Sequence, residues 1–375
     1  MRRLPVATVA VIAGLLGTTL SVLAATGTGS ASVSDDGANA NKITVAMTGM
    51  APAPAGTAYE GWLISDDGSV KTSVGLLRPA SDGTVNATWT SPNRENLFGR
   101  YSRFAVTLEP SPDRDPAPSN TVVFQDQIAG PVMIHIRHLQ VEWPAAPRGT
   151  GQAVGVRDQG WLTRLHSGFL VDAYRANNLA VTKLHGEHLV NIIEGSKGPN
   201  YGDIDGNGQV ANPGDGFGLL TYAQLAEDHA GFAAAATGAT SLTKLHSSHV
   251  IAAAQNIKAW DARIRDIGLV AGRAQNLAQV QPLLGELELL GNATFNGIDA
   301  NGNGQIELIR GEAGADIAYV HSQLIGTFTM TGDGTPLALP RTGDAGMFTL
   351  TLWVMLAGAA AVALGSLLRM RRVNA

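Results

Sequence analysis

Histidines recur in this sequence in a pattern that could hold a metal ion. A Thr-Lys-Leu-His-x-x-His segment occurs twice, and each copy follows a segment that begins His-x-Gly-Phe. The histidines of the two copies are His166, His185 and His188, and His229, His246 and His249. Neutral imidazole is the commonest protein ligand for zinc, copper, nickel and haem iron. These six residues therefore suggest binding of a transition metal or of haem.

Helices are the elements that must position these histidines. Each i, i+3 pair lies on one helix face, and Leu, Val and Ile recur beside both pairs at helical spacing, which predicts that the pairs face the core. A histidine from the preceding helix would complete three nitrogens per copy of a duplicated helical hairpin. The alternative is a set of core histidines bonded to backbone carbonyls, to Glu187 or Asp228, or to trapped water, because an unpartnered buried imidazole costs roughly 1 to 3 kcal/mol. The chain has no cysteine, which excludes thiolate ligands, a C-x-x-C-H haem attachment and disulfides.

Two further segments resemble the calcium loops of EF-hand and dockerin proteins. Oxygen-bearing side chains stand at positions 1, 3 and 5, a glycine at 6 and an aliphatic residue at 8, but position 12 is Gly214 in one loop and Arg310 in the other. The resemblance implies the ligands Asp203, Asp205, Asn207, Gln209 and Asp215, and Asp299, Asn301, Asn303, Gln305 and Glu312. The alternative is a cluster of Asx turns that needs no ion.

Residues 43–128 read as a small β-sandwich. Short alternating runs at 43–47, 59–64, 74–77, 84–89, 104–108 and 121–124 are separated by turn residues such as Asp-Asp-Gly and Ser-Asp-Gly. The runs at 59–64, 73–77 and 104–110 resemble the extracytoplasmic C-terminal domain of anti-sigma-K factors. Such factors carry a sigma-binding segment and a membrane helix ahead of this domain, where this sequence has a stretch typical of a signal peptide. The resemblance therefore implies the fold and an outside location, without sigma binding.

Both ends of the sequence carry export signals. Residues 1–32 have two arginines, a long apolar run and small residues near Ala24, as in a signal peptide; an uncleaved anchor is the alternative. Residues 331–375 contain Leu339-Pro340-Arg341-Thr342-Gly343, an apolar run at 347–368 and a cluster of arginines. This tail resembles the LPxTG cell-wall sorting signal, which implies sortase and peptidoglycan as partners and cleavage after Thr342. The alternative is an ordinary C-terminal anchor with a chance pentapeptide.

The predicted fold class is α+β and multidomain, with the β-sandwich followed by an all-α bundle of duplicated hairpins. We expect a linker at 33–42, the bundle at 131–330, and membrane contact only through 347–368 before sorting. Five arginines and one acid fall outside residues 33–342, which leaves 21 basic and 30 acidic residues and a net charge of −9. Such an acidic region argues against nucleic acid binding.

The sequence thus predicts a wall-anchored surface protein of a Gram-positive type envelope, whose histidines bind a transition metal or haem and whose loops bind calcium. It names no surface partner. No G-x-S-x-G or phosphate loop is present, which favours a binding protein over an enzyme, although histidines alone could support a metal-centred oxidase or hydrolase. The alternatives are a structural or adhesive module with core histidines, and an envelope stress-signalling component similar to anti-sigma factors.

Overall fold

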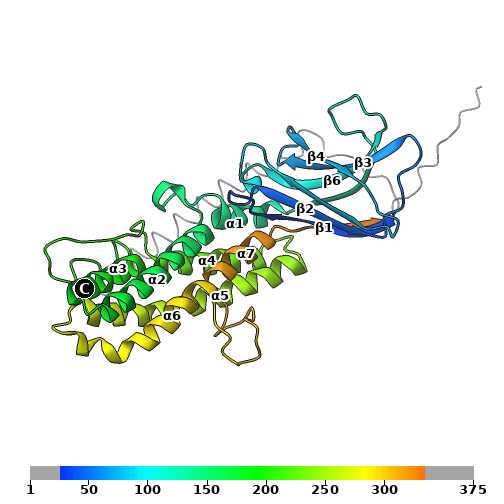
Figure 1. The fold of residues 1–375 in the computed structure, drawn as a ribbon. Helices are drawn as coiled ribbons and strands as arrows, with labels where there is room; N and C mark the ends of the chain where they lie inside the picture. The colour runs from blue at the N-terminus through cyan, green and yellow to red at the C-terminus, as the bar shows by residue number, and fades with distance from the viewer. Residues whose placement is uncertain (1–25, 334–375) are drawn as a thin grey trace, which may run out of the picture.

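The structure, a computed structural model, describes residues 26–333. Two antiparallel sheets of four strands form one end of this region, and seven α-helices form a bundle that extends away from them (Figure 1). The α+β fold class predicted from the sequence is confirmed.

The described region contains eight strands and seven α-helices. The strands are β1 (Thr26–Ser34), β2 (Lys42–Thr48), β3 (Thr57–Ser65), β4 (Lys71–Leu77), β5 (Val85–Thr90), β6 (Tyr101–Pro110), β7 (Val122–Gln127) and β8 (Phe328–Asp333). The helices are α1 (Gly130–Gln140), α2 (Gln152–Arg175), α3 (Leu179–Glu194), α4 (Leu219–Ala235), α5 (Ser241–Gly272), α6 (Leu284–Asn296) and α7 (Ala315–Leu324).

The sandwich packs two antiparallel sheets face to face, in the orders β5-β2-β1-β8 and β4-β3-β6-β7. Alternation puts one face of each strand in the core: in β2, Ile43, Val45 and Met47 are buried while the residues between them are not. Phe104 of one sheet packs on Phe328 of the other, with ring centroids 6.0 Å apart. All six strands predicted from the sequence are present.

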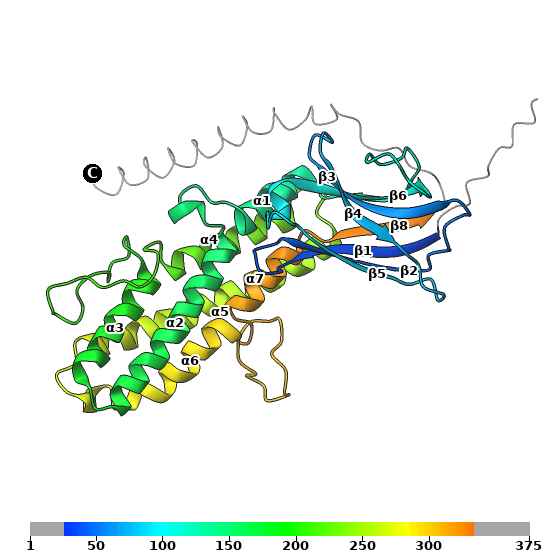
Figure 2. The same cartoon turned by 45° about the horizontal axis from the view of Figure 1, so that its top comes forward.

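Two strands of the sandwich lie outside its predicted bounds of 43–128. Strand β1 covers residues assigned to the signal peptide (1–32) and to the linker (33–42), and β8 crosses the predicted boundary between the bundle and the tail. Strand β1 was missed because its small, polar residues carry a weak hydrophobic pattern, yet Ala31 and Val33 are fully buried. Figure 2 shows β8 beside β1, although the two are separated in the sequence by the whole bundle.

The helices α3 and α5 approach each other closely where the residues at their contact are glycines. On α3, the residue between His185 and Glu187 is Gly186, and a Cβ there would lie 2.8 Å from the Gly268 oxygen and 2.6 Å from the Gly272 nitrogen of α5. Glycine at this crossing lets the two backbones approach each other. The predicted duplicated hairpins correspond to α2–α3 and α4–α5, each joined by a short connection.

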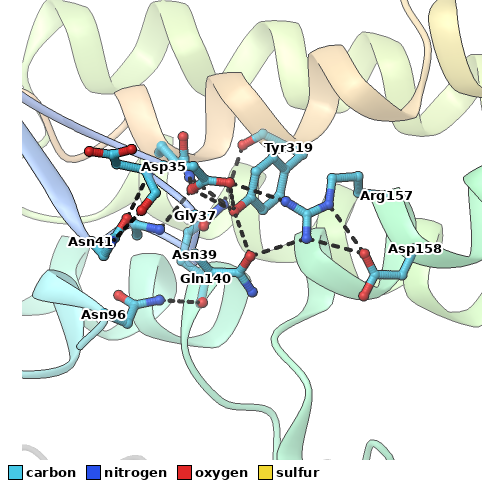
Figure 3. Close-up of polar contacts among 12 residues, drawn as sticks. Asp35, Gly37, Asn39, Asn41, Asn96, Gln140, Arg157, Asp158 and Tyr319 are labelled. Atoms are coloured by element: carbon cyan, nitrogen blue, oxygen red, sulfur yellow. Dashed lines mark hydrogen bonds and ion pairs between the residues drawn. The ribbon is translucent and has the colours of Figure 1, made fainter. Parts of the chain in front are cut away.

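A polar network joins the bundle to the sandwich (Figure 3). The Tyr319 hydroxyl of α7 lies 2.9 Å from both carboxylate oxygens of Asp35, which follows β1 directly. The Arg157 guanidinium of α2 lies 3.3 Å from Asp35 and stacks 3.9 Å from the centre of the Tyr319 ring. The predicted linker at 33–42 is therefore an ordered contact between the two parts of the molecule.

Within residues 26–333, no helix is both long enough and apolar enough to cross a membrane. Most of the predicted signal peptide, the pentapeptide at 339–343 and the apolar run at 347–368 lie outside the described residues.

Candidate metal centres

The nine histidines of the chain gather in three groups of three. In each group one helix supplies an i, i+3 pair and a second helix supplies a lone histidine. The groups are the α1–α4 site (His135, His138, His229), the α2–α3 site (His166, His185, His188) and the α5–α7 site (His246, His249, His321).

The Nδ1 atoms converge in the same way in all three sites. The Nδ1 of the lone histidine lies 2.9 and 3.3 Å from those of the pair in the α1–α4 site, 3.1 and 3.2 Å in the α2–α3 site, and 2.9 and 3.1 Å in the α5–α7 site. An Nδ1 carries either one proton or one lone pair, so the lone histidine cannot form two good hydrogen bonds with it. Two nitrogens of a tetrahedral ion with bonds of about 2.0 Å lie about 3.3 Å apart. The separations of the lone histidine from the pair are at or somewhat below this value, so each trio could hold a single ion.

Buried neighbours fix the direction of each lone histidine. The residue that follows it and the residue three positions before it are small or short and fully buried in all three helices. These residues are Ser167, Ala230 and Ser322, and Thr163, Ala226 and Ala318. With both neighbours in the core, the histidine stands at the edge of the buried stripe.

A buried neighbouring residue also positions each pair of histidines. The residue after the second histidine of each pair is Leu139, Leu189 or Val250, and each is fully buried. The pairs themselves are half-buried, whereas the lone His166 and His229 are each only 8% exposed. The prediction that the histidines face the core thus applies to these two, while the pairs lie nearer the surface, where an ion can reach them.

Burial keeps the histidines unprotonated at neutral pH. Loss of hydration lowers the pKa of all nine below the usual 6.5, and neighbouring histidines lower it further at most of them. The pKa falls to about 3 for His229 and to about 4 for His135, His166, His185 and His321. Their lone pairs are therefore free to bind a metal at pH 7.

Aromatic rings cover two of the sites. Phe169, one turn after His166, lies 5.3 Å from that ring and 5.4 Å from His185, measured between centroids. Phe232, one turn after His229, lies 5.5 Å from that ring and 5.5 Å from His135. Trp143 adds a second ring to the α1–α4 site, 5.0 Å from His138.

The predicted grouping of His229 with His246 and His249 is wrong. We expected His229 to join His246 and His249 of its own hairpin, but it joins α1, and the pair on α5 joins His321 of α7. Helices α4 and α5 nevertheless pack against each other, and Gln255 and Lys258 of α5 bond to Glu227 of α4. Periodicity shows which face a residue occupies and leaves open which helix lies opposite.

Three ligand candidates were therefore missed: His135, His138 and His321. The first two have the same i, i+3 spacing as the other pairs, followed by the same type of aliphatic residue. His321 could have been found from its small neighbours, which match those of His166 and His229.

The two calcium-type loops share one internal geometry. Asp203 accepts backbone N–H groups from Gly206, Asn207 and Gly208 at 2.8 to 3.1 Å, and Asp299 accepts the equivalent three at 2.7 to 3.1 Å. Asn207 and Asn303 each accept one N–H group from the glutamine two residues on. These are the bonds of Asx turns, which the front half of a calcium loop also contains.

In the first loop, the acid beside the front residues is not the predicted Asp215. Asp215 accepts the Tyr222 hydroxyl at 2.7 Å, and the acid that gathers with Asp203 and Asp205 is Glu187 of α3. Glu312 is buried and accepts the Glu307 N–H at 2.7 Å. Among the described residues, only the first loop brings three acids together. Glu187 was missed because it lies between His185 and His188, well before the loop in sequence.

Residues 6–122 match the protein family described as Anti-sigma-K factor rskA, C-terminal. In the described region the match extends from β1 to the first residue of β7, and it includes neither the helices nor the calcium-type loops. The resemblance predicted for the sandwich is thereby confirmed. No curated protein and no solved structure matches the chain.

Proposed function

We propose that the helical bundle of this protein binds transition-metal ions, one at each of the three histidine sites. The observation that carries this proposal is the repeated convergence of three Nδ1 atoms from two helices, which accounts for every histidine in the chain. Three sites of one build in one bundle suit the capture or storage of metal, and electron transfer is a further use if the ion is copper or iron.

The ligand set favours zinc, copper or nickel over haem. Three imidazole nitrogens are a common ligand set for zinc and copper ions, which take nitrogen at about 2.0 Å. Two axial nitrogens of a haem iron would stand on opposite sides of the ring, about 4 Å apart at the same bond length. The Nδ1 separations of 2.9 to 3.3 Å are shorter than this.

Elemental analysis tests the proposal. We would purify the full chain in mild detergent with a tag free of histidine, dialyse it against zinc or copper, and measure bound metal. We expect about three equivalents, one per site, and about two after His246→Ala and His249→Ala together. Ser248→Ala, between these residues on the same helix, is the matched control and should leave the metal content unchanged.

The contrary result is also informative. If the double variant kept its metal content, His246 and His249 would not be metal ligands; if the intact chain bound no transition metal, all the histidines would be packing residues. The protein would then be a structural or adhesive module.

We further propose that calcium braces the first loop, at Asp203, Asp205 and Glu187. Three carboxylates in one group repel one another, and a calcium ion would offset that repulsion. Titration calorimetry should show calcium uptake that Asp203→Asn weakens. Heat signals that are the same for both proteins would contradict it.

The export signals support an outside location, which we propose for the whole described region. Strand β1 begins at Thr26, directly after the small residues Ala24 and Ala25, so a cut at that point would leave the sandwich whole. The LPxTG-like tail supports attachment to peptidoglycan by a sortase. Thr342→Ala should then shift the protein from the wall fraction to the membrane or the medium, and an unchanged distribution would count against the attachment.

A second function is favoured by the family match: a component of envelope stress signalling similar to anti-sigma factors. It rests on residues 6–122, the part of the chain that matches the family. Deleting the gene should then change the transcripts of a sigma-factor regulon, and restoring the full chain should reverse that change. A deletion that alters metal content and no such regulon would favour metal binding alone.

A further inference from the structure

The three histidine sites differ in what covers them. In the α1–α4 and α2–α3 sites, a phenylalanine stands three residues after the lone histidine and lies against two of the three imidazoles. In the α5–α7 site that position is Leu324. Within residues 26–333, the rings of His246, His249 and His321 contact no aromatic ring outside their own trio.

The difference in burial agrees with the difference in cover. His166 and His229 are 8% exposed, whereas all three histidines of the α5–α7 site are half-buried. The exposed apolar residues beside the α5–α7 site are Leu245 and Val320, which precede His246 and His321, whereas at the other two sites they include the covering rings themselves, Phe169 and Phe232.

We infer that the α5–α7 site holds its metal with an open coordination position, and that a small donor molecule such as water, hydroxide or a small anion binds there. Three protein ligands with a fourth position open to water is the arrangement of catalytic metal sites. All three trios leave that fourth position without a protein ligand, but in two of them a phenylalanine ring lies against the imidazoles and hinders access to it. The two phenylalanine-covered sites then retain metal, and the α5–α7 site is where bound metal meets molecules from outside. This inference rests on the proposed metal binding.

The residue three positions after the lone histidine determines how well each site is covered. A phenylalanine there can turn its ring over the adjacent imidazoles, because residues i and i+3 lie on one helix face. The shorter Leu324 covers less of that surface. Exchanging the two residue types should therefore exchange the behaviour of the sites.

Cobalt(II) spectroscopy with azide as the probe tests the inference. Visible bands of cobalt(II) report its coordination number, and azide changes them only where it can bind the ion. Three single-site proteins would be prepared from the full chain, each keeping one trio while the pairs of the other two are changed to alanine. Azide should shift the cobalt bands saturably in the α5–α7 protein and leave those of the α2–α3 protein unchanged.

Two substitutions that spare all ligands make the test specific. Leu324→Phe should weaken azide binding at the α5–α7 site by about tenfold or more, the scale on which residues around a metal's ligands act. Phe169→Ala should create an azide response in the α2–α3 protein. Both substitutions can also be made in the intact chain, so the result does not depend on the folding of the single-site proteins.

An equal azide response at the α2–α3 and α5–α7 sites, or no response at the α5–α7 site, would overturn the inference while leaving metal binding intact. Failure of every protein, including the intact chain, to bind cobalt would overturn the proposed function itself.

Discussion

His135 of α1 and His229 of α4 are separated by 94 positions in the sequence, and their Nδ1 atoms lie 2.9 Å apart. Helix α1 is also fixed to the sandwich, because Arg137 pairs with Asp66 through two bonds of 2.8 and 2.9 Å. The α1–α4 site therefore links the helix that leaves the sandwich to the middle of the bundle. A metal bound there would hold distant parts of the chain together.

His229→Ala should remove one equivalent of bound metal, and so should His135→Ala with His138→Ala. Because the proposal assigns all three residues to one ion, combining the three substitutions should cost no more metal than either variant alone. Elemental analysis of the three proteins measures this.

The matched comparison uses the hairpin partner. His246→Ala with His249→Ala, added to His229→Ala, should remove a second equivalent, since the structure assigns that pair to another site. A loss of only one equivalent from this combination would show that His229 serves its own hairpin instead.

Acid should destabilise the metal-free protein over a defined range of pH. An unfolded histidine takes up a proton near pH 6.5, whereas burial lowers the pKa of His166 to about 4 and of His229 to about 3. Between these values the unfolded chain binds more protons than the folded one, so the free energy of unfolding falls as the pH drops from 6.5 toward 4. Above pH 6.5 these histidines should not change the free energy of unfolding with pH.

Urea unfolding of the metal-free chain at several pH values measures the effect. With metal bound, the free energy of unfolding should depend more steeply on pH, because protons compete with the ion for the same nitrogens. A midpoint in urea that stays constant from pH 6.5 to 4.5 would show that the histidines titrate as exposed groups.

Glu187→Gln should loosen the loop between α3 and α4. The carboxylate accepts backbone N–H groups from Ile204, Asp205 and Ala211 at 2.6 to 3.1 Å. A glutamine replaces one oxygen with an N–H donor that faces another donor, and bonds to charged groups contribute about 1.5 to 3 kcal/mol. We expect a loss of roughly 3 kcal/mol in unfolding free energy and faster proteolysis within residues 195–218.

The second loop provides the control. Glu312 accepts one backbone N–H group there, so Glu312→Gln should cost less than Glu187→Gln. Equal losses would mean that the number of bonds to the loop does not determine its stability.

Tyr319→Phe should weaken the junction between the sandwich and the bundle. The change keeps the ring on which Arg157 stacks and removes the hydroxyl that donates to Asp35. A hydrogen bond to a charged group contributes about 1.5 to 3 kcal/mol, and we expect a loss of that order in thermal or chemical unfolding. Tyr201→Phe, at a hydroxyl without a hydrogen-bond partner in residues 26–333, should be neutral by comparison.

The sequence predicted the elements of this fold better than their pairing. Alternation located six strands because buried Ile, Val, Leu and Phe residues mark them. The same signal is weak in β1, whose residues are mostly Thr, Gly and Ser, and its partner β8 lies after the bundle. Long-range pairing of this kind leaves no local pattern.

The same limit applies to the sites. The i, i+3 spacing identified His185 and His188 as a pair, and His166 joined them because its hairpin is closed by a short turn. His229 and His321 find their partners on helices that are distant in sequence. Helical periodicity determines the face of a residue, whereas the choice of neighbouring helix depends on the packing of the whole bundle.

The pairing of Thr26 with Asp333 brings the two ends of the described chain to one point, at the end of the sheet away from the bundle (Figure 1). Strand β1 alone measures about 30 Å over its nine residues. Suppose that the C-terminal tail is fixed to an envelope. A force pulling the bundle outward would then run along the axis of β8, at right angles to the hydrogen bonds that join β8 to β1. The hydrogen bonds of that pairing would then be loaded in shear, together rather than one after another. Under that force, the pairing of β8 with β1 would resist separation of the tail from the histidine sites.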